Sequence, residues 1–175
     1  MKSEGPAQRI VIEERHPAWR GRTELGAMLS IPCGAYDDQT FAMFDAYLER
    51  LQSAGIERCI MFSQPLPDTP IPRGKAARRL YALLQQERGR FVAVVNAIHG
   101  DSLWRRAARA FLNRLVTAYD DHPIAWVRDV RDAADWAWQI AERQQIVLPA
   151  SNPAELHDWL DRGLRELTAE PEAAP

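Results

Sequence analysis

The sequence predicts an α/β domain with a five-stranded, mostly parallel sheet, an antiparallel opening pair of strands and an extra helix at the C-terminal end. The strongest indication is the run Phe91–Val95, which is apolar on both alternating faces, as in a strand covered on both sides. A helix with one apolar stripe follows it, and strands alternate with helices along most of the chain. The stripe comprises Leu103, Trp104, Ala107, Ala108, Phe111, Leu112, Leu115, Val116 and Tyr119.

The opening pair is assigned to residues 9–14 and 24–31, with a turn between them that contains His16, Pro17 and Gly21. Two strands joined by a short turn are expected to pair antiparallel. Asp37 or Asp38 then caps a helix that reaches about Ala54. Its buried stripe is Phe41, Phe44, Leu48 and Leu51, widened by Met43 and Tyr47.

The central part of the chain alternates strictly between strand and helix. Residues 57–63 form the third strand, and the loop 64–73 contains four prolines, which exclude regular structure and make the loop stiff. A helix over 74–88 precedes the strand at Phe91, and its inward residues are Ala77, Leu80, Tyr81 and Leu84.

The last part of the chain supplies one strand and two helices. Residues 124–127 form the fifth strand, and a helix beginning at Asp129 or Asp132 buries Ala133, Trp136, Ala137, Ile140 and Ala141. Ser151 or Asn152 caps the final helix, whose stripe is Leu156, Trp159, Leu160, Leu164 and Leu167. That helix either packs on the open face of the sheet or is exchanged between protomers of a homo-oligomer.

Composition narrows the class of protein. The 175 residues suit one domain, and a formal net charge of −2 gives no indication of nucleic-acid binding. The two cysteines, Cys33 and Cys59, are too far apart for a metal motif or a disulfide framework, and no cofactor motif is present. No apolar stretch has the length of a signal peptide or a membrane span, so we expect a cytoplasmic protein.

Three stretches resemble the STAS-like proteins, small bacterial relatives of the anti-sigma-factor antagonists whose fold is related to the CRAL-TRIO lipid-transfer domain. They are IPRGKAARRLYALLQ at 71–85, RFVAVVNAIHGDSLWRRAARAFLNRL at 90–115 and IAWVRDVRDAADWAWQ at 124–139. The resemblance covers roughly residues 9–141. We therefore expect a STAS-like domain at 9–145, followed by a C-terminal helical extension at 146–167 that the resemblance leaves unexplained. The polar composition of residues 1–8 predicts a flexible N-terminus, and the small and acidic residues of 168–175 predict a disordered tail.

The antagonists carry a phosphorylatable serine at the start of the helix after the third strand. At that junction this chain has Ser63 and the proline loop, where Thr69 is the only other hydroxyl, and the Asp-Ser-Ser/Gly type of motif is absent. Ser63 and Thr69 are therefore the only candidates for such a switch, and neither fits the motif.

The turn containing His99, Asp101 and Ser102 follows a strand, and ligands of open α/β sheets bind at the carboxyl ends of strands. Helix capping accounts for Asp101 and Ser102, because three residues of one tight turn seldom form a catalytic triad. Binding of an anion at the N-terminus of the following helix stays open.

Two further groups are candidates for partner contacts. Arg73, Arg78, Arg105 and Arg106 lie at the starts of two helices and form either one basic patch or an ordinary solvated face. Trp138 lies on the side of its helix opposite Trp136, where it is either covered by the final helix or exposed as a contact residue.

The leading hypothesis is a non-catalytic, STAS-like interaction module that binds a protein partner in a regulatory role. The alternative is a domain that binds a small hydrophobic ligand or a lipid in an apolar pocket beneath the proline loop. A third hypothesis, an enzyme that uses the His99 turn, has no catalytic constellation to support it.

Overall fold

The computed structural model describes residues 10–67, 69–98, 102–116 and 123–169, with the backbone alone described at 109 and 111–116. The predictions made for residues 1–8, for His99 and Asp101, and for the tail beyond 169 lie outside these residues.

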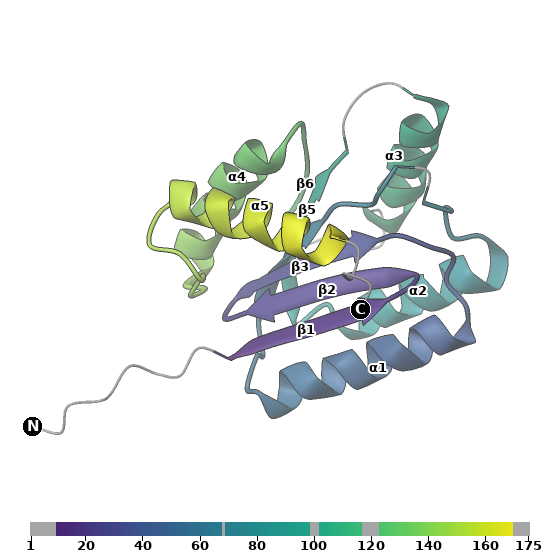
Figure 1. Ribbon diagram of the computed structural model, residues 1–175, viewed down its shortest axis with the longest axis horizontal. Helices are drawn as coiled ribbons and strands as arrows, with labels where there is room; N and C mark the ends of the chain where they lie inside the picture. The colour runs from purple at the N-terminus through teal and green to yellow at the C-terminus, as the bar shows by residue number, and fades with distance from the viewer. Residues whose placement is uncertain (1–9, 68, 99–101, 117–122, 170–175) are drawn as a thin grey trace, which may run out of the picture.

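The sheet has six strands in the order β1-β2-β3-β4-β5-β6 (Figure 1). The first three are antiparallel neighbours, and β3 to β6 are parallel. The α/β class and the mixed sheet are confirmed. The strands are β1 (Val11–His16), β2 (Trp19–Glu24), β3 (Ala27–Pro32), β4 (Cys59–Ser63), β5 (Phe91–Ala97) and β6 (Ile124–Val127).

The prediction of five strands and an opening pair is wrong, because β2 was assigned to the turn. Its sequence, WRGRTE, has two arginines and a glycine and shows no apolar alternation. The strand is stabilised by ladders on both sides, to β1 and to β3, so pairing outweighs its weak intrinsic preference.

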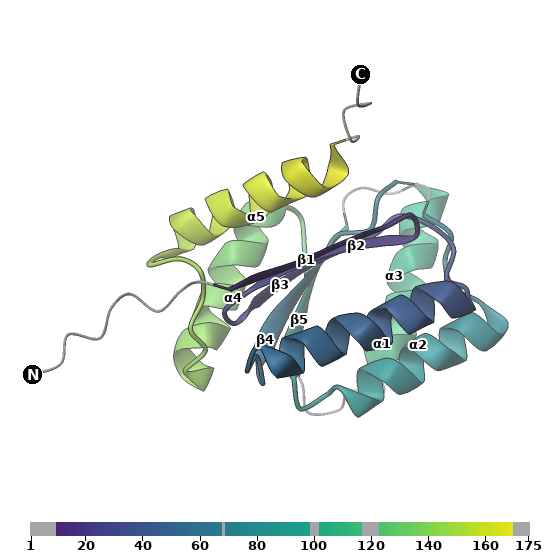
Figure 2. The ribbon, with the colours of Figure 1, turned by 60° about the horizontal axis from the view of Figure 1, so that its bottom comes forward.

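Helices cover both faces of the sheet (Figure 2). The connections through α1, α2 and α3 all run in the same direction across the parallel strands, so their right-handed crossovers place the three helices on one face. The last two helices, α4 and α5, pack on the other face. The bounds are α1 (Asp38–Ser53), α2 (Gly74–Gln86), α3 (Leu103–Val116), α4 (Val130–Gln144) and α5 (Pro153–Thr168).

The final helix packs on its own chain, which is the first of the two predicted arrangements. Its Trp159 donates a hydrogen bond from Nε1 to the buried carboxylate of Glu24 on β2, at 2.8 Å. The predicted N-caps are also confirmed: Asp37, Asp129 and Asn152 each accept a hydrogen bond from the backbone of the next helix.

Two core clusters follow from the alternation of side chains along the strands. Leu29 and Ile31 of β3 face α4 and α5, whereas Met28 faces α1 together with buried aromatic residues such as Phe41. Cys59 lies fully buried in this second cluster.

Several predicted core residues are not buried. Tyr81 is 39% exposed and Leu103 is 78% exposed, while Ala107 is also exposed and Trp136 is only half-buried. Leu103 and Ala107 are one position before Trp104 and Ala108, which lie on the covered side of α3, so the helical rotation of about 100° per residue turns them to solvent.

Helix α2 has an apolar face, but none of its residues is buried. Its leucines 80, 83 and 84 are half-buried. The reason is the pocket that lies between this helix and the sheet.

Candidate functional site

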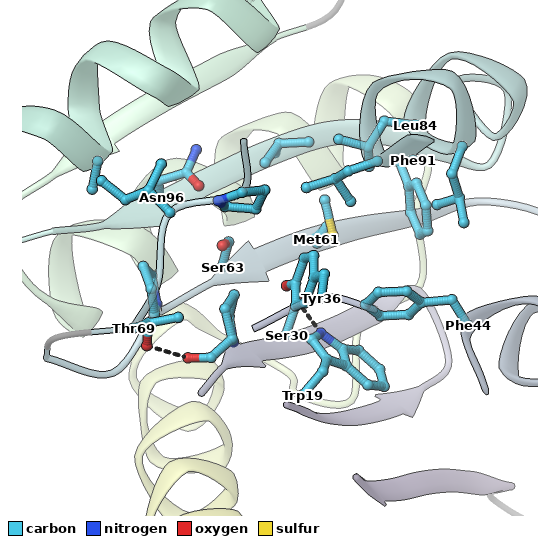
Figure 3. Close-up of a pocket in the computed structure, with 18 of the residues that line it drawn as sticks. Trp19, Ser30, Tyr36, Phe44, Met61, Ser63, Thr69, Leu84, Phe91 and Asn96 are labelled. Atoms are coloured by element: carbon cyan, nitrogen blue, oxygen red, sulfur yellow. Dashed lines mark hydrogen bonds between the residues drawn. The ribbon is translucent and has the colours of Figure 1, made fainter. Parts of the chain in front are cut away.

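Three polar side chains form a row across the parallel part of the sheet, on the face that α1, α2 and α3 cover. Ser30 of β3 is the register partner of Ser63 of β4, and Ser63 is the partner of Asn96 of β5. Residues paired in this way point to the same face. The row lies near the carboxyl ends of its strands, where α/β sheets bind ligands (Figure 3).

Trp19 extends this row onto β2. Its indole lies over Gly21, the register partner of Ser30, so closely that a Cβ at Gly21 would be 1.9 Å from the ring. The indole Nε1 donates a hydrogen bond to Ser30 Oγ at 2.8 Å, which Figure 3 marks with a dashed line. The ring also makes edge-on contacts with Phe44 and Tyr47 of α1. Glycine at position 21 is therefore what allows this wall of the site to form.

The row forms part of the floor of a pocket with a volume of about 140 Å³, partly open to solvent. The floor continues into an apolar row of the same face, Met61, Val94 and Ile124, which are also register partners. Residues of α1, α2, α3 and the proline loop make the walls. They are Phe44, Tyr47, Leu48, Leu80, Leu83, Leu84, Trp104, Ala108, Pro65, Thr69, Pro70, Ile71 and Pro72.

Thr69 fixes the proline loop over the pocket. Its hydroxyl donates to the carbonyl oxygens of Leu66, at 2.7 Å, and Pro32, at 3.0 Å, as alternative or shared acceptors. Its own carbonyl accepts a hydrogen bond from Trp104 Nε1 at 2.6 Å. The loop is therefore tied to the end of β3 and to α3, and its prolines restrict it further.

Asn96 is the unusual polar group of the site. It is 2% exposed, and its Oδ1 has no hydrogen-bond partner in the described part of the chain. Most buried polar groups in proteins are hydrogen-bonded, so an unpaired amide oxygen beside a cavity indicates a function for the site or an absent partner.

The pocket is electrically neutral as far as it is described. None of its described lining residues is Asp, Glu, Lys, Arg or His. Burial raises the pKa of Tyr36, with a smaller contribution from Cys33, so the Tyr36 hydroxyl at this pocket stays protonated at neutral pH. The arrangement offers apolar contact and neutral hydrogen bonds.

None of the predicted contact residues that are described lines the pocket, and Trp138 lies on α4, on the opposite face of the sheet. Ser63 and Thr69, the two candidates for phosphorylation, do line it. Ser102 caps α3, where its Oγ accepts a hydrogen bond from the backbone nitrogen of Arg105 at 3.3 Å, as predicted. Thr69 is buried and engaged in the loop. Ser63 and Thr69 thus remain candidates for a phosphorylation switch whose motif the chain lacks.

Two of the basic residues in the first half of α2 contact α1. Lys75 and Arg79 pair with Asp38, and the Arg79 guanidinium lies 4.7 Å from the ring centroid of Phe41. Arg73 and Arg78 are exposed, as is Arg106 of α3, whereas Arg105 is half-buried. One continuous basic patch for a partner stays a prediction.

Trp138 is half-buried against the core that α4 and α5 share, and its Nε1 donates a hydrogen bond to Glu142 at 2.9 Å. The burial of Trp138 is thus intermediate between the two alternatives, coverage by the final helix and full exposure as a contact residue.

Asn96, Ser30, Tyr36 and Trp19 were not identified from the sequence. The signal for two of them was present, since Ser30 and Asn96 interrupt otherwise apolar strands near their carboxyl ends. Recognising it requires the register of the sheet, which the sequence does not supply.

Comparison with known proteins finds no match: no family model, no curated protein and no solved structure resembles the chain closely enough. The STAS-like assignment therefore stays a prediction. No helix in the described ranges is long and apolar enough to cross a membrane. Within the same ranges, no group of three or more His, Cys, Asp or Glu side chains is arranged to hold a metal ion.

Proposed function

We propose that the protein binds a small apolar molecule in the pocket between the sheet, the proline loop and α2. The observation that supports this most is the pocket itself, about 140 Å³ in volume and lined almost entirely by apolar side chains. Ligand sites are typically concave and apolar, with a small number of placed polar groups. The pocket lies beneath residues 64–73, where the alternative hypothesis of a ligand-binding domain expects one.

The volume sets the size of the ligand. An engineered apolar cavity of about 150 Å³ is large enough to bind benzene. The pocket therefore fits a single aromatic ring or a short aliphatic chain, with room for further atoms only toward solvent. This is too small to enclose the two acyl chains of a phospholipid.

The side chains that line the pocket favour binding of a ligand without catalysis. The described lining supplies no carboxylate, imidazole or amine to act as a general acid or base, and its tyrosine at position 36 is held neutral. The hydrogen bonds of Thr69 and the prolines hold the loop in place, so little order has to be gained when a ligand binds.

The test is a titration of the protein with toluene and with phenol, followed by backbone amide NMR. We expect at least one probe to shift the resonances of pocket residues, and Leu84→Trp, which fills the pocket from α2, to abolish the shifts. Ala82→Trp is the matched control, since Ala82 is exposed on the same helix and its variant should bind normally. Absence of binding by both probes, or equal binding by the two variants, would contradict the proposal.

The regulatory module that binds a protein partner, implied by the STAS-like resemblance, remains a separate prediction. A reproducible partner recovered with purified wild-type protein and lost in Arg78→Glu/Arg106→Glu would support it.

A further inference from the structure

The polar row gives the pocket a chemical preference beyond size, and the inference drawn from it rests on the proposed ligand-binding function. Asn96 Oδ1 is a hydrogen-bond acceptor that is buried and has no partner among the described residues. Leaving such an atom unpaired is unfavourable, and a ligand that brings a donor removes the cost.

The residue beside it supplies the complementary half of the interaction. Ser63 is the register partner of Asn96, and Figure 3 shows its hydroxyl on the same side of the sheet as the Asn96 amide. No hydrogen bond joins the Ser63 side chain to another residue within the described ranges, so its hydroxyl is free to donate or accept. Ser30, the next member of the row, already accepts a hydrogen bond from Trp19.

Charge excludes the commonest alternative head groups. A carboxylate or ammonium buried in this pocket would find no opposite charge among the described lining residues. A buried charge without a partner is strongly unfavourable. A fatty acid or an amine is therefore a poorer ligand here than a neutral molecule of the same shape.

We propose that the pocket selects an uncharged molecule that has one hydroxyl group on a small apolar body, such as a phenol or a short alcohol. A rotation of the Asn96 amide presents its oxygen to the pocket, where the hydroxyl binds between Asn96 and Ser63, donating to the amide oxygen and accepting from the serine. The apolar body lies on Met61, Val94 and Ile124 and beneath the leucines of α2. The polar row lies near the carboxyl ends of the parallel strands. The ligand's hydroxyl therefore lies at these ends, and its apolar body extends toward the amino ends.

The test compares phenol, toluene and benzoate as probes, because phenol and toluene have nearly the same shape and benzoate adds a charge. Dissociation constants come from backbone amide NMR titrations of the wild-type protein, Asn96→Leu and Ser63→Ala. In the wild type we expect phenol to bind about tenfold more tightly than toluene, and benzoate to bind least. In Asn96→Leu the preference for phenol over toluene should disappear, while toluene binds at least as tightly as before.

Each result decides between distinct conclusions. Equal binding of phenol and toluene by the wild type, or a preference for phenol that survives in both variants, overturns the hydroxyl inference and leaves the pocket proposal intact. Tightest binding of benzoate overturns it in the same way. If none of the three probes binds the wild type, the proposed function itself is wrong. Ser63→Ala covers the case in which Asn96→Leu does not fold, and it should reduce the phenol preference severalfold.

Discussion

Replacing Asn96 with leucine should stabilise the protein. The side chain is 2% exposed, and its Oδ1 has no partner in the described part of the chain, so the folded state bears the cost of desolvating that atom. That cost is about 1–3 kcal/mol for one buried unpaired polar group. Leucine has a similar size and no polar atom, so the free energy of unfolding should rise by about the same amount. For a domain of this length, the melting temperature should rise by about 2–12 °C.

The assay is urea unfolding followed by circular dichroism, with the slope of the free energy against urea concentration expected to stay constant. Asn152→Leu is the matched control, because Asn152 Oδ1 caps α5 by accepting a hydrogen bond from the Glu155 nitrogen at 2.9 Å. Loss of that cap should cost about 0.5–2 kcal/mol. The same substitution thus has opposite effects at the two sites. A clear loss of stability in Asn96→Leu would refute the reasoning, because it would show that the amide is satisfied in the folded protein.

Three further predictions concern the sheet and its packing. Trp159→Phe removes the hydrogen bond to the buried carboxylate of Glu24 and should lower the free energy of unfolding by about 1.5–3 kcal/mol, and a change below about 0.5 kcal/mol in urea unfolding would contradict this. Gly21→Ala should displace the indole of Trp19, lower stability by about 1–3 kcal/mol and change the tryptophan emission, whereas an unchanged spectrum would show that the ring does not depend on the glycine. Burial raises the pKa of Cys59 to about 12. The unfolded thiol loses its proton near pH 8.5, so the native state then binds more protons and stability falls as the pH rises. The loss is about 1 kcal/mol in total between about pH 8.5 and 9.5, and the slope approaches about 1.4 kcal/mol per unit above that range. Urea unfolding at these pH values should show this slope in the wild type and a smaller one in Cys59→Ala, and equal slopes would argue against a buried thiol.

The sequence predicts most elements of this fold because their apolar periodicity is strong. The helices at 38–53, 130–144 and 153–168 have both an apolar stripe and a side-chain cap, so their starts were predicted to within one or two residues. Strand β2 was missed because its stabilisation is non-local. Its backbone pairs with the neighbouring strands β1 and β3, but its buried Glu24 accepts a hydrogen bond from Trp159 of α5, 135 residues further along the chain, which no short window of the sequence includes.

The place of the pocket is expected only under the alternative hypothesis, and none of the described residues predicted as contacts lines it. Four prolines between a strand and a helix indicated a rigid loop, and the pocket lies beneath it. In the sequence, Asn96 is a single polar residue within an apolar strand. Only the pairing of β4 with β5 shows that it lies beside Ser63. The His99 turn is predicted by the same rule about strand ends, but the residue of this segment that lines the cavity, Asn96, lies three positions earlier in the chain.

The contacts that hold the proline loop and the start of α2 explain why this helix does not pack directly onto the sheet. Moving α2 onto the sheet would bury the apolar walls of the pocket, and burial of apolar surface is favourable. Closing the pocket requires α2 to move toward β4 and β5. The start of that helix is held by the proline loop, through Thr69, and by the pairing of Arg79 with Asp38 of α1. Loosening the loop, for example by Thr69→Val, should therefore let the pocket shrink, so that probe binding weakens while the hydrophobic contacts of α2 increase.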